Sequence, residues 1–312
     1  MELLMASENL DYGYAERFVK LGLWGKWNYS PGAINILFIQ GATPRQEGAI
    51  PERINSNNNE PDKYNDTCVL ARVNPQTKQK EIYASIGTSE PGEYYTTGPD
   101  ANPQGAAHMC WGQHEMEPLQ RSKDGRLALQ GKGGKTRFWR DRRNQGTRYS
   151  QDVDEIPRTD AIGQWFHAMG TGDTIGKWSA GCVGPCGGYE GKAWQIFLGW
   201  LKDHAKDTPI ILTLWGVEDF CEFSIAARHA YGPIRFDPTL RMGVRDMNDY
   251  GPVHHLQELL RDSHHNPGGI DGDWMGKTQN AFLEFQEANG LKPDGICGSK
   301  SWQKLKILVY GG

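Results

Sequence analysis

The chain has 312 residues, which is enough for about two ordinary domains. Lys and Arg number 34 against 38 Asp and Glu, and the net charge of −4 argues against a general nucleic-acid binder, which is usually markedly basic. No run of about 18 apolar residues occurs, which excludes a membrane-spanning helix, while 39 Gly, 11 Trp and 12 Tyr favour turn-rich β structure.

The N-terminal segment begins with a short apolar stretch that no basic residue precedes and that Glu2 and Glu8 interrupt. It is therefore not typical of a secretory signal peptide, and we expect synthesis in the cytoplasm. A reducing compartment predicts mostly free thiols, with a redox or metal pair of Cys182 and Cys186 as the weaker alternative. The six cysteines are Cys68, Cys110, Cys182, Cys186, Cys221 and Cys297.

The first half of the chain predicts β structure. A β-branched run that ends in glycine predicts a first strand at 33–41. Two further apolar runs, 67–73 and 80–87, flank an Asn-Pro-Gln-Thr turn and predict a hairpin. Shorter strands are predicted at 127–130 and 137–141, with glycine-rich turns between them.

The second half predicts a helix, a buried strand and a domain boundary. Aromatic and apolar residues at helical spacing predict a core helix at 192–206, and an apolar run predicts a strand at 209–215. In the first half of the chain, by contrast, a polar, Pro- and Asn-rich stretch at 42–63 predicts a surface loop. Prolines and glycines before residue 240 indicate a linker, so the predicted units are an N-terminal extension at 1–34, a first domain at 35–240 and a module at 241–312.

Positive charge gathers in the segment from Arg121 to Arg148, which holds ten basic residues against Asp124 and Asp141. A solvated loop and strand face is the simpler interpretation. A surface that faces an anionic partner, such as an acidic wall polymer, is the alternative.

The C-terminal module contains a doubled motif. Asp271–Gly276 and Asp294–Gly298 each carry Asp-Gly followed by a glycine, and each precedes a predicted helix. Aspartate accepts hydrogen bonds from the next backbone amides and glycine adopts positive φ, so both segments predict a tight turn into a helix. Three short helices would then share one core through Val253, Leu256, Leu260, Ala281, Phe282, Phe285 and Leu305.

This module closely resembles the small three-helix peptidoglycan-binding domain of bacteria. The resemblance implies non-covalent attachment to the cell wall and no chemistry, with the contacts expected at Asp271, Gly272, Trp274, Asp294, Gly295 and Trp302. The residues that carry it are Val253, Leu256, Gln257, Leu260, Asp271, Gly272, Gly276, Thr278, Ala281, Phe285, Gln286, Gly290, Leu291, Asp294, Gly295, Gly298, Trp302 and Leu305.

A candidate catalytic site lies in the segment 165–188, which combines a histidine, many glycines and a cysteine among small residues. A cysteine nucleophile needs a nearby base and backbone N–H groups for the oxyanion. His167 precedes Cys182 by fifteen residues, so the two can meet if two strands joined by the intervening loop lie side by side. A buried structural cysteine and a core histidine are the alternatives.

The Ser-Ala-Gly-Cys sequence at 179–182, with an upstream histidine, resembles the signature of the YkuD-type L,D-transpeptidases. The resemblance implies that Cys182 is the nucleophile and His167 the general base, and that Ser179 and Gly181 shape the oxyanion region. Two departures are visible, because Ala180 stands where the family has histidine and Val183-Gly184 replace the usual Arg or Asn pair.

Other titratable residues offer weaker sites. His108, Cys110 and His114 are a conceivable metal cluster, although their spacing fits no standard zinc site. Glu115, Glu117 and Asp66 are candidate carboxylates of a muramidase. The histidines of the module are predicted to be surface residues, with a metal site as the alternative: His254, His255, His264 and His265.

The sequence as a whole predicts an α+β protein, a β-rich YkuD-like catalytic domain followed by the peptidoglycan-binding module. We expect a cysteine enzyme that cleaves or exchanges amide bonds of peptidoglycan stems, and hydrolysis by a phage lysin fits the lack of an export signal. The alternatives are a non-catalytic wall-binding or virion protein and a glycosidase. Peptidoglycan is the expected partner of a monomer that uses no cofactor and binds neither nucleic acid nor membrane.

Overall fold

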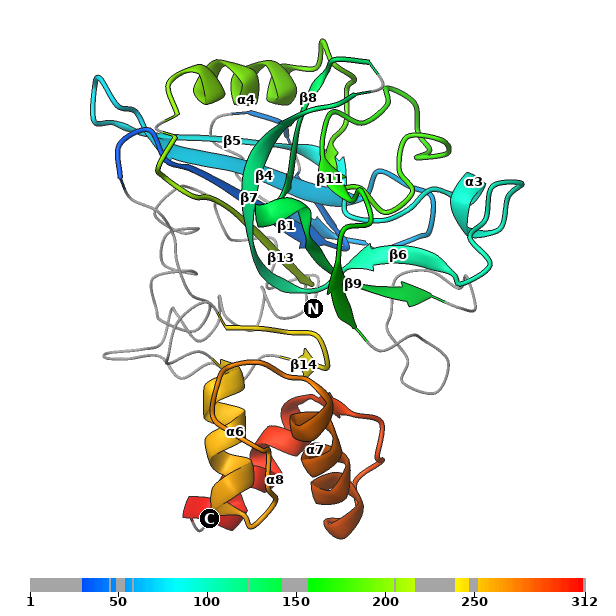
Figure 1. The fold of residues 1–312 in the computed structure, drawn as a ribbon, viewed down its shortest axis with the longest axis vertical. Helices are drawn as coiled ribbons and strands as arrows, with labels where there is room; N and C mark the ends of the chain where they lie inside the picture. The colour runs from blue at the N-terminus through cyan, green and yellow to red at the C-terminus, as the bar shows by residue number, and fades with distance from the viewer. Residues whose placement is uncertain are drawn as a thin grey trace.

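The computed structural model describes residues 30–44, 46–48, 54–57, 59–122, 124–141, 157–204, 206–216, 239–246 and 252–310. Most of the predicted N-terminal extension lies outside these residues, as do Cys221 and parts of the predicted loop 42–63 and of the basic stretch 121–148. A large β-rich domain comes first in the described chain, and a small helical module follows it (Figure 1). The α+β class is therefore observed, with the helices of the module at the C-terminal end.

The first domain is built on an eight-stranded sheet of order β11-β8-β7-β13-β1-β4-β5-β12. The predicted strands and the predicted hairpin are confirmed, and β4 and β5 pair antiparallel around a turn that the Asn74 side chain caps. The strands of this sheet are β1 (Ile34–Gln40), β4 (Asp66–Val73), β5 (Lys80–Thr88), β7 (Gly112–Gln120), β8 (Leu127–Gly131), β11 (Trp165–Phe166), β12 (Gly184–Pro185) and β13 (Ile210–Gly216).

The two edges of this sheet meet. Val183, next to β12, forms a parallel bridge with Phe166 of β11, so the last strand in the order contacts the first. The bridge is held by hydrogen bonds from His167 N–H to the Val183 carbonyl at 3.0 Å and from Val183 N–H to the Trp165 carbonyl at 2.9 Å. This closure brings residues near 166 and 183 together although the chain between them is a long loop.

Both faces of the central strands are buried, and their residues accordingly form nearly continuous apolar runs. On one face, Ile36 and Phe38 pack with Phe197 of the helix α4 (Lys192–Lys202), which lies over the sheet in Figure 1. On the other face, Leu37 and Ile39 belong to a cluster that continues into the helical module. The aromatic stripe of α4 is thus core, as its spacing predicts.

Smaller elements complete the first domain. A three-stranded sheet of order β10-β9-β6 lies beside the main sheet, and β2 and β3 form a short pair. None of the helices in the described residues is long and apolar enough to span a bilayer. The remaining elements are β2 (Ala42–Pro44), β3 (Ile54–Ser56), α3 (Glu93–Thr96), β6 (Ala106–Met109), η1 (Lys132–Gly134), β9 (Thr136–Asp141) and β10 (Arg158–Asp160).

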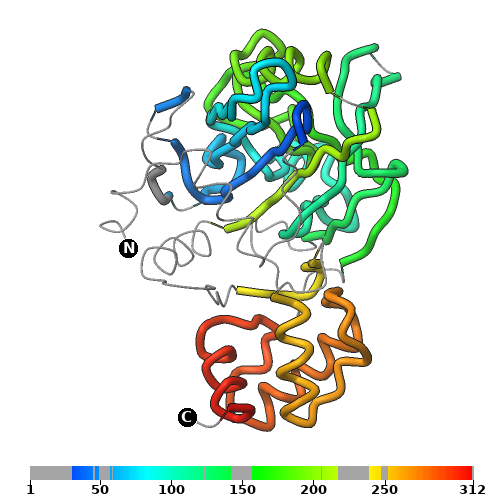
Figure 2. The backbone as a smooth tube through the Cα atoms, turned by 90° about the vertical axis from the view of Figure 1, so that its left-hand side faces the viewer, coloured from blue at the N-terminus to red at the C-terminus, as the bar shows by residue number. Residues whose placement is uncertain are grey.

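The module consists of three helices and one strand pair. The helices are α6 (Pro252–Asp262), α7 (Gly276–Ala288) and α8 (Ser299–Tyr310), and they pack as one body in Figure 2. Every residue of the predicted three-helix core is buried. The strand β14 (Leu240–Arg241) pairs with β15 (Ile296–Cys297), so the chain already belongs to the module at residue 240.

Three contacts join the module to the first domain. Arg137 of β9 forms an ion pair with Asp273. The guanidinium of Arg241 lies over the ring of Trp111, 3.9 Å from its centroid, which is the geometry of a cation–π contact. A shared apolar cluster that includes Cys110 and Met242 lies between them. The module is therefore packed against the sheet.

Candidate active site

The strand pairing at the closure of the sheet positions Cys182 and His167. The side chains of Phe166 and Val183 both point into the core under α4 and are fully buried. Because successive side chains on a strand alternate between faces, Cys182 and His167 project from the opposite face of the same two strands. The two strands that the spacing requires do lie side by side, and they place the two residues as diagonal neighbours.

The turn before Cys182 is held by internal hydrogen bonds. The Ser179 hydroxyl accepts from Gly181 N–H at 3.0 Å and donates to the Cys182 carbonyl at 2.8 Å. Gly181 has a φ of 120°, and a Cβ on it would lie 2.1 Å from the carbonyl oxygen of Ala107 on β6. Ser179 and Gly181 therefore fix the turn itself. The Gly181 N–H is occupied, whereas the Cys182 N–H donates to no described residue.

A pocket of about 190 Å³ opens beside Cys182, whose side chain is half-buried. His167 does not line it. The thiol donates to the Gly163 carbonyl at 3.8 Å and accepts from Trp165 N–H at 3.4 Å, and it makes no hydrogen bond to His167. The lining residues are Tyr95, Asp100, Asn102, Ala106, Ala107, Arg140, Ile162, Gly163, Gln164, Ala180 and Cys182.

Burial controls the protonation of both residues. The His167 side chain is 5% exposed, and this desolvation lowers the pKa of the imidazole to about 4. Its Nδ1 donates to the Ala168 carbonyl at 2.7 Å, which leaves Nε2 as the unprotonated nitrogen of the neutral ring. Desolvation also raises the pKa of the Cys182 thiol to about 11, and the Trp165 N–H and Arg121 oppose this rise. Near neutral pH the Cys182 thiol and the His167 imidazole are therefore both uncharged.

Alkylation of Cys182 should reveal this protonation state. With a pKa of about 11, the thiolate fraction at pH 7 is about one in ten thousand. We expect iodoacetamide to modify Cys182 more than about a hundredfold more slowly than free cysteine at pH 7, with a rate that still rises above pH 9. Peptide mapping by mass spectrometry across a pH series measures this rate. A plateau already reached near pH 7 would show a stabilised thiolate instead.

The segment 88–95 supports the turn that holds Cys182. Gly92 N–H donates to the Ser179 carbonyl at 2.9 Å. The Asp62 carboxylate accepts hydrogen bonds from the N–H groups of Glu93, at 2.9 Å, and Gly176, at 2.7 Å. A Cβ on Gly92 would lie 2.1 Å from the Gly176 carbonyl oxygen, so the two segments are in direct backbone contact. No sequence pattern marks Asp62, although an aspartate in a loop commonly accepts hydrogen bonds from backbone amides.

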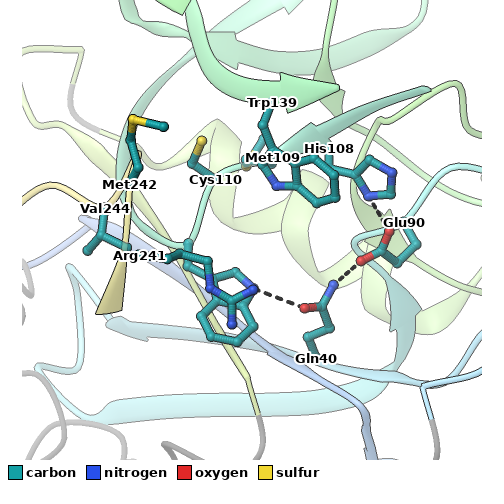
Figure 3. A pocket seen from close by; sticks show the side chains of 10 residues that line it. Gln40, Glu90, His108, Met109, Cys110, Trp139, Arg241, Met242 and Val244 are labelled. Atoms are coloured by element: carbon teal, nitrogen blue, oxygen red, sulfur yellow. Dashed lines mark hydrogen bonds and ion pairs between the residues drawn. The ribbon is translucent and has the colours of Figure 1, made fainter. Parts of the chain in front are cut away.

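The conceivable metal cluster is dispersed in the structure. His108 Nδ1 lies 2.5 Å from the Glu90 carboxylate, and the His108 ring stacks on Trp139 with ring centroids 4.2 Å apart (Figure 3). His114 Nε2 instead donates to the carbonyl of Cys110 at 2.8 Å. No group of three or more metal-ligating side chains occurs in the part of the chain that the structure describes.

The candidate carboxylates are each engaged by neighbours. Glu115 pairs with Lys132, and Glu117 accepts a hydrogen bond from Gln130 at 2.8 Å. Asp66 is fully buried and accepts from Gly41 N–H, at 2.9 Å, and from Ser89 N–H and hydroxyl, both at 2.7 Å. Burial nevertheless raises the pKa of Asp66 to about 7. These contacts give Asp66 a structural role under the segment 88–95.

In the module, one buried glutamine organises each Asp-Gly turn. The side-chain carbonyl of Gln257 accepts hydrogen bonds from the N–H groups of Asp271 and Gly272, both at 2.9 Å. The side-chain amide nitrogen of Gln257 donates to the Asp271 carboxylate at 2.8 Å. Gln286 repeats this arrangement with Gly295 N–H at 2.9 Å and the Asp294 carboxylate at 3.1 Å. The doubled motif is therefore a doubled structural unit.

The residues expected to contact the wall divide into two groups. Asp271 is exposed and Asp294 is half-buried, whereas Gly272 and Gly295 are buried with φ of 69° and 67°. Trp274 and Trp302 are 0% and 1% exposed, and Trp274 Nε1 donates to Gln279 at 2.6 Å. The two indole rings thus belong to the core of the module, because aromatic rings supply most of the apolar area that so small a core can bury.

Replacing Gln286 with leucine should destabilise the module. The change removes three hydrogen bonds and leaves Gly295 N–H buried without its acceptor, a loss of about 2–4 kcal/mol in the free energy of unfolding. Gln303→Leu, at an exposed position of α8, is the matched control and should change stability little. Denaturant titration followed by tryptophan fluorescence measures both. Equal stability of the two variants would contradict the role of Gln286 in holding the Asp294-Gly295 turn.

The histidines of the module make ordinary structural contacts. His254 Nδ1 lies 3.1 Å from the buried carboxylate of Asp246, and His255 stacks on Trp302 with ring centroids 5.8 Å apart. His265 contacts the Ser263 hydroxyl at 3.1 Å. His264 has a φ of 67° at the end of α6. The four side chains are therefore not gathered into one metal site.

A comparison with protein-family models identifies a match in the C-terminal module. Residues 250–305 match the family model described as "Putative peptidoglycan binding domain". This match supports association with the cell wall and peptidoglycan as a partner of the module. A search of curated proteins finds no match to the chain.

Gln164 is a site residue that sequence analysis misses. Its side-chain amide donates to the Gly181 carbonyl at 2.5 Å, and it lines the pocket beside Cys182. The side chain is buried, and its carbonyl oxygen has no partner in the described part of the chain. No local pattern marks this glutamine, because its role comes from a residue seventeen positions later in the sequence.

Proposed function

We propose that the chain is a peptidoglycan-active cysteine enzyme of the YkuD type that cleaves or exchanges amide bonds of the peptide stems. One observation carries the proposal. Cys182 and His167 project from one face of two paired strands, and Cys182 opens onto a pocket in a chain whose other part matches a peptidoglycan-binding domain. The wall-binding module supplies a high local concentration of substrate.

The proposed reaction begins from the neutral pair. As Sγ of Cys182 attacks the stem carbonyl carbon, its proton passes to Nε2 of His167, which the Nδ1 contact to Ala168 keeps unprotonated. This requires the thiol to turn from Gly163 toward His167, a change that substrate binding commonly brings about at such sites. The tetrahedral oxyanion accepts a hydrogen bond from the unengaged Cys182 N–H.

Collapse of this intermediate breaks the carbon–nitrogen bond. His167 returns its proton to the leaving nitrogen, the amine departs, and the acyl group remains on Cys182 as a thioester. Water then attacks the thioester in hydrolysis, or the amine of a second stem attacks it in exchange. In either case His167 takes a proton from the attacking group and returns it to the Cys182 sulfur.

Digestion of purified sacculi tests the proposal. The full chain is incubated with sacculi, and the soluble products are identified by mass spectrometry. Stem peptides with new carboxyl and amine ends are expected, and their loss in Cys182→Ala assigns the cut to this thiol. Release of reducing sugars would point to a glycosidase, and cuts that persist in Cys182→Ala would overturn the assignment.

A second candidate function is a wall-binding or virion protein without catalysis. Two observations favour it: the raised pKa of the Cys182 thiol, and the engagement of the Gly181 N–H with Ser179 in place of an oxyanion. Under this alternative the full chain sediments with sacculi yet releases no soluble product. The same digestion therefore separates the two functions.

A further inference from the structure

Gln164, which lines the pocket beside Cys182, carries a buried acceptor that no donor of the described residues reaches. Gln164 is 3% exposed, and its Oε1 has no hydrogen-bond partner among the described residues. Buried polar atoms are almost always hydrogen-bonded, so an exception beside a pocket calls for a partner, which is a solvent molecule or a ligand. Gln164 lines the pocket together with Cys182 and Ala180.

The orientation of the Gln164 amide follows from its other contact. Its Nε2 donates to the carbonyl oxygen of Gly181 at 2.5 Å, and a reversed amide would place two carbonyl oxygens against each other. The Gly181 carbonyl is itself fixed, because Ser179 holds the turn and Gly181 packs on Ala107. The side chain is thus locked with its acceptor directed away from the turn.

The rest of the pocket suits a peptide. Its lining combines apolar groups of Ala106, Ala107 and Ile162 with the charges of Asp100 and Arg140. A buried neutral acceptor among such groups matches an amide N–H, the commonest donor of a peptide backbone. A peptide N–H bound at Gln164 would also hold the chain next to the Cys182 thiol, which lines the same pocket.

We propose that Gln164 is the substrate-positioning residue of this pocket, and that its side-chain carbonyl accepts a hydrogen bond from one backbone N–H of the peptidoglycan stem. This inference rests on the proposed function for the identity of the ligand. It assigns two roles to one side chain. The amide nitrogen holds the turn of the nucleophile, and the amide oxygen aligns the substrate against it.

The test measures peptide binding, without catalysis, to the full chain carrying Cys182→Ala. The probe is a synthetic stem tetrapeptide with a diamino acid at its third position, together with the same peptide N-methylated at each backbone amide in turn. Isothermal titration calorimetry should show that N-methylation of one particular amide weakens binding about five- to tenfold. Equal binding of all the N-methylated peptides, or no binding of the parent peptide, would overturn the proposal.

A matched pair of variants then locates that N–H. Gln164→Met, which keeps the length of the side chain, should weaken the parent peptide about five- to tenfold and leave the critical N-methylated peptide within twofold. Gln195→Met, at an exposed position of α4, should change neither. If Gln164→Met binds every peptide as the parent protein does, the acceptor is satisfied by solvent and the proposal is wrong.

These binding experiments distinguish a failure of the positioning role of Gln164 from a failure of the proposed enzymatic function. N-methylated peptides probe the pocket with Gln164 intact, so a variant that folds poorly does not decide the result. Cleavage of sacculi by the unsubstituted chain with no effect of Gln164→Met on binding overturns the positioning role alone. Weakened binding in a chain that cleaves nothing upholds the binding site and overturns the enzyme.

Discussion

Replacing Cys182 with alanine is expected to lower the release of stem peptides from sacculi by a factor on the order of 10⁴ or more. In the proposed mechanism Cys182 forms the covalent intermediate, so no later step can proceed without it, and losses of this size follow removal of a nucleophile from a catalytic unit. Alanine also fits the space of the half-buried thiol, so the fold should persist. The measurement is the initial rate of product release, quantified by mass spectrometry.

Cys186→Ala is the matched control for this loss. Cys186 is the other half-buried cysteine of the same segment, its thiol donates to the Gly170 carbonyl at 3.1 Å, and it does not line the pocket beside Cys182. The control should keep its rate within about twofold of the unsubstituted chain. His167→Ala should show most of the loss of Cys182→Ala, because residues that act as one unit are not additive. Equal rates for the two cysteine variants would mean that Cys182 has no catalytic role.

Local sequence carries much of the fold. The β-branched run of β1 and the aromatic stripe of α4 predict their own elements. A strand buried on both faces requires a nearly continuous apolar run, and a helix buried on one side requires an apolar stripe at helical spacing. The strand β7, at Gly112–Gln120, is missed. Its residues are mostly polar and include a proline, and its place in the sheet depends on pairing with β13 and β8.

The candidate site, like the fold, could be predicted from the sequence only in part. The cysteine and histidine stand out as residue types, and the spacing between them already suggests paired strands. The protonation of Cys182 does not follow from the sequence, because the burial that raises the pKa of its thiol comes from tertiary packing. In the module, the roles of Trp274 and Trp302 could not be predicted from the sequence. An aromatic residue near a turn fits both a wall-contacting position and a position in a small core, and only the packing in the structure shows that these two rings are buried.

The close approach of two backbones at Gly184 predicts the largest effect on stability. A Cβ at this position would lie 1.7 Å from the carbonyl oxygen of His167, far inside van der Waals contact. The carbonyl oxygen belongs to the backbone and the position of the Cβ is fixed by the backbone of residue 184, so no side-chain rotation relieves the clash, and the segment that carries Cys182 must move away from β11. We therefore expect Gly184→Ala to lower the free energy of unfolding by about 3 kcal/mol or more.

Gly172→Ala is the control for this change, because it lies in the loop between β11 and β12 and a Cβ there meets nothing within 4 Å. Thermal unfolding followed by circular dichroism should show a lower midpoint for Gly184→Ala and an unchanged midpoint for Gly172→Ala. An unchanged midpoint for both variants would mean that the strand pair is looser than the structure shows. The separation of Cys182 from His167 should also cost activity, because a dyad tolerates little displacement. Stability and the proposed catalysis would then depend on one contact, since the bridge that closes the sheet is the same one that sets the two candidate catalytic side chains on a common face.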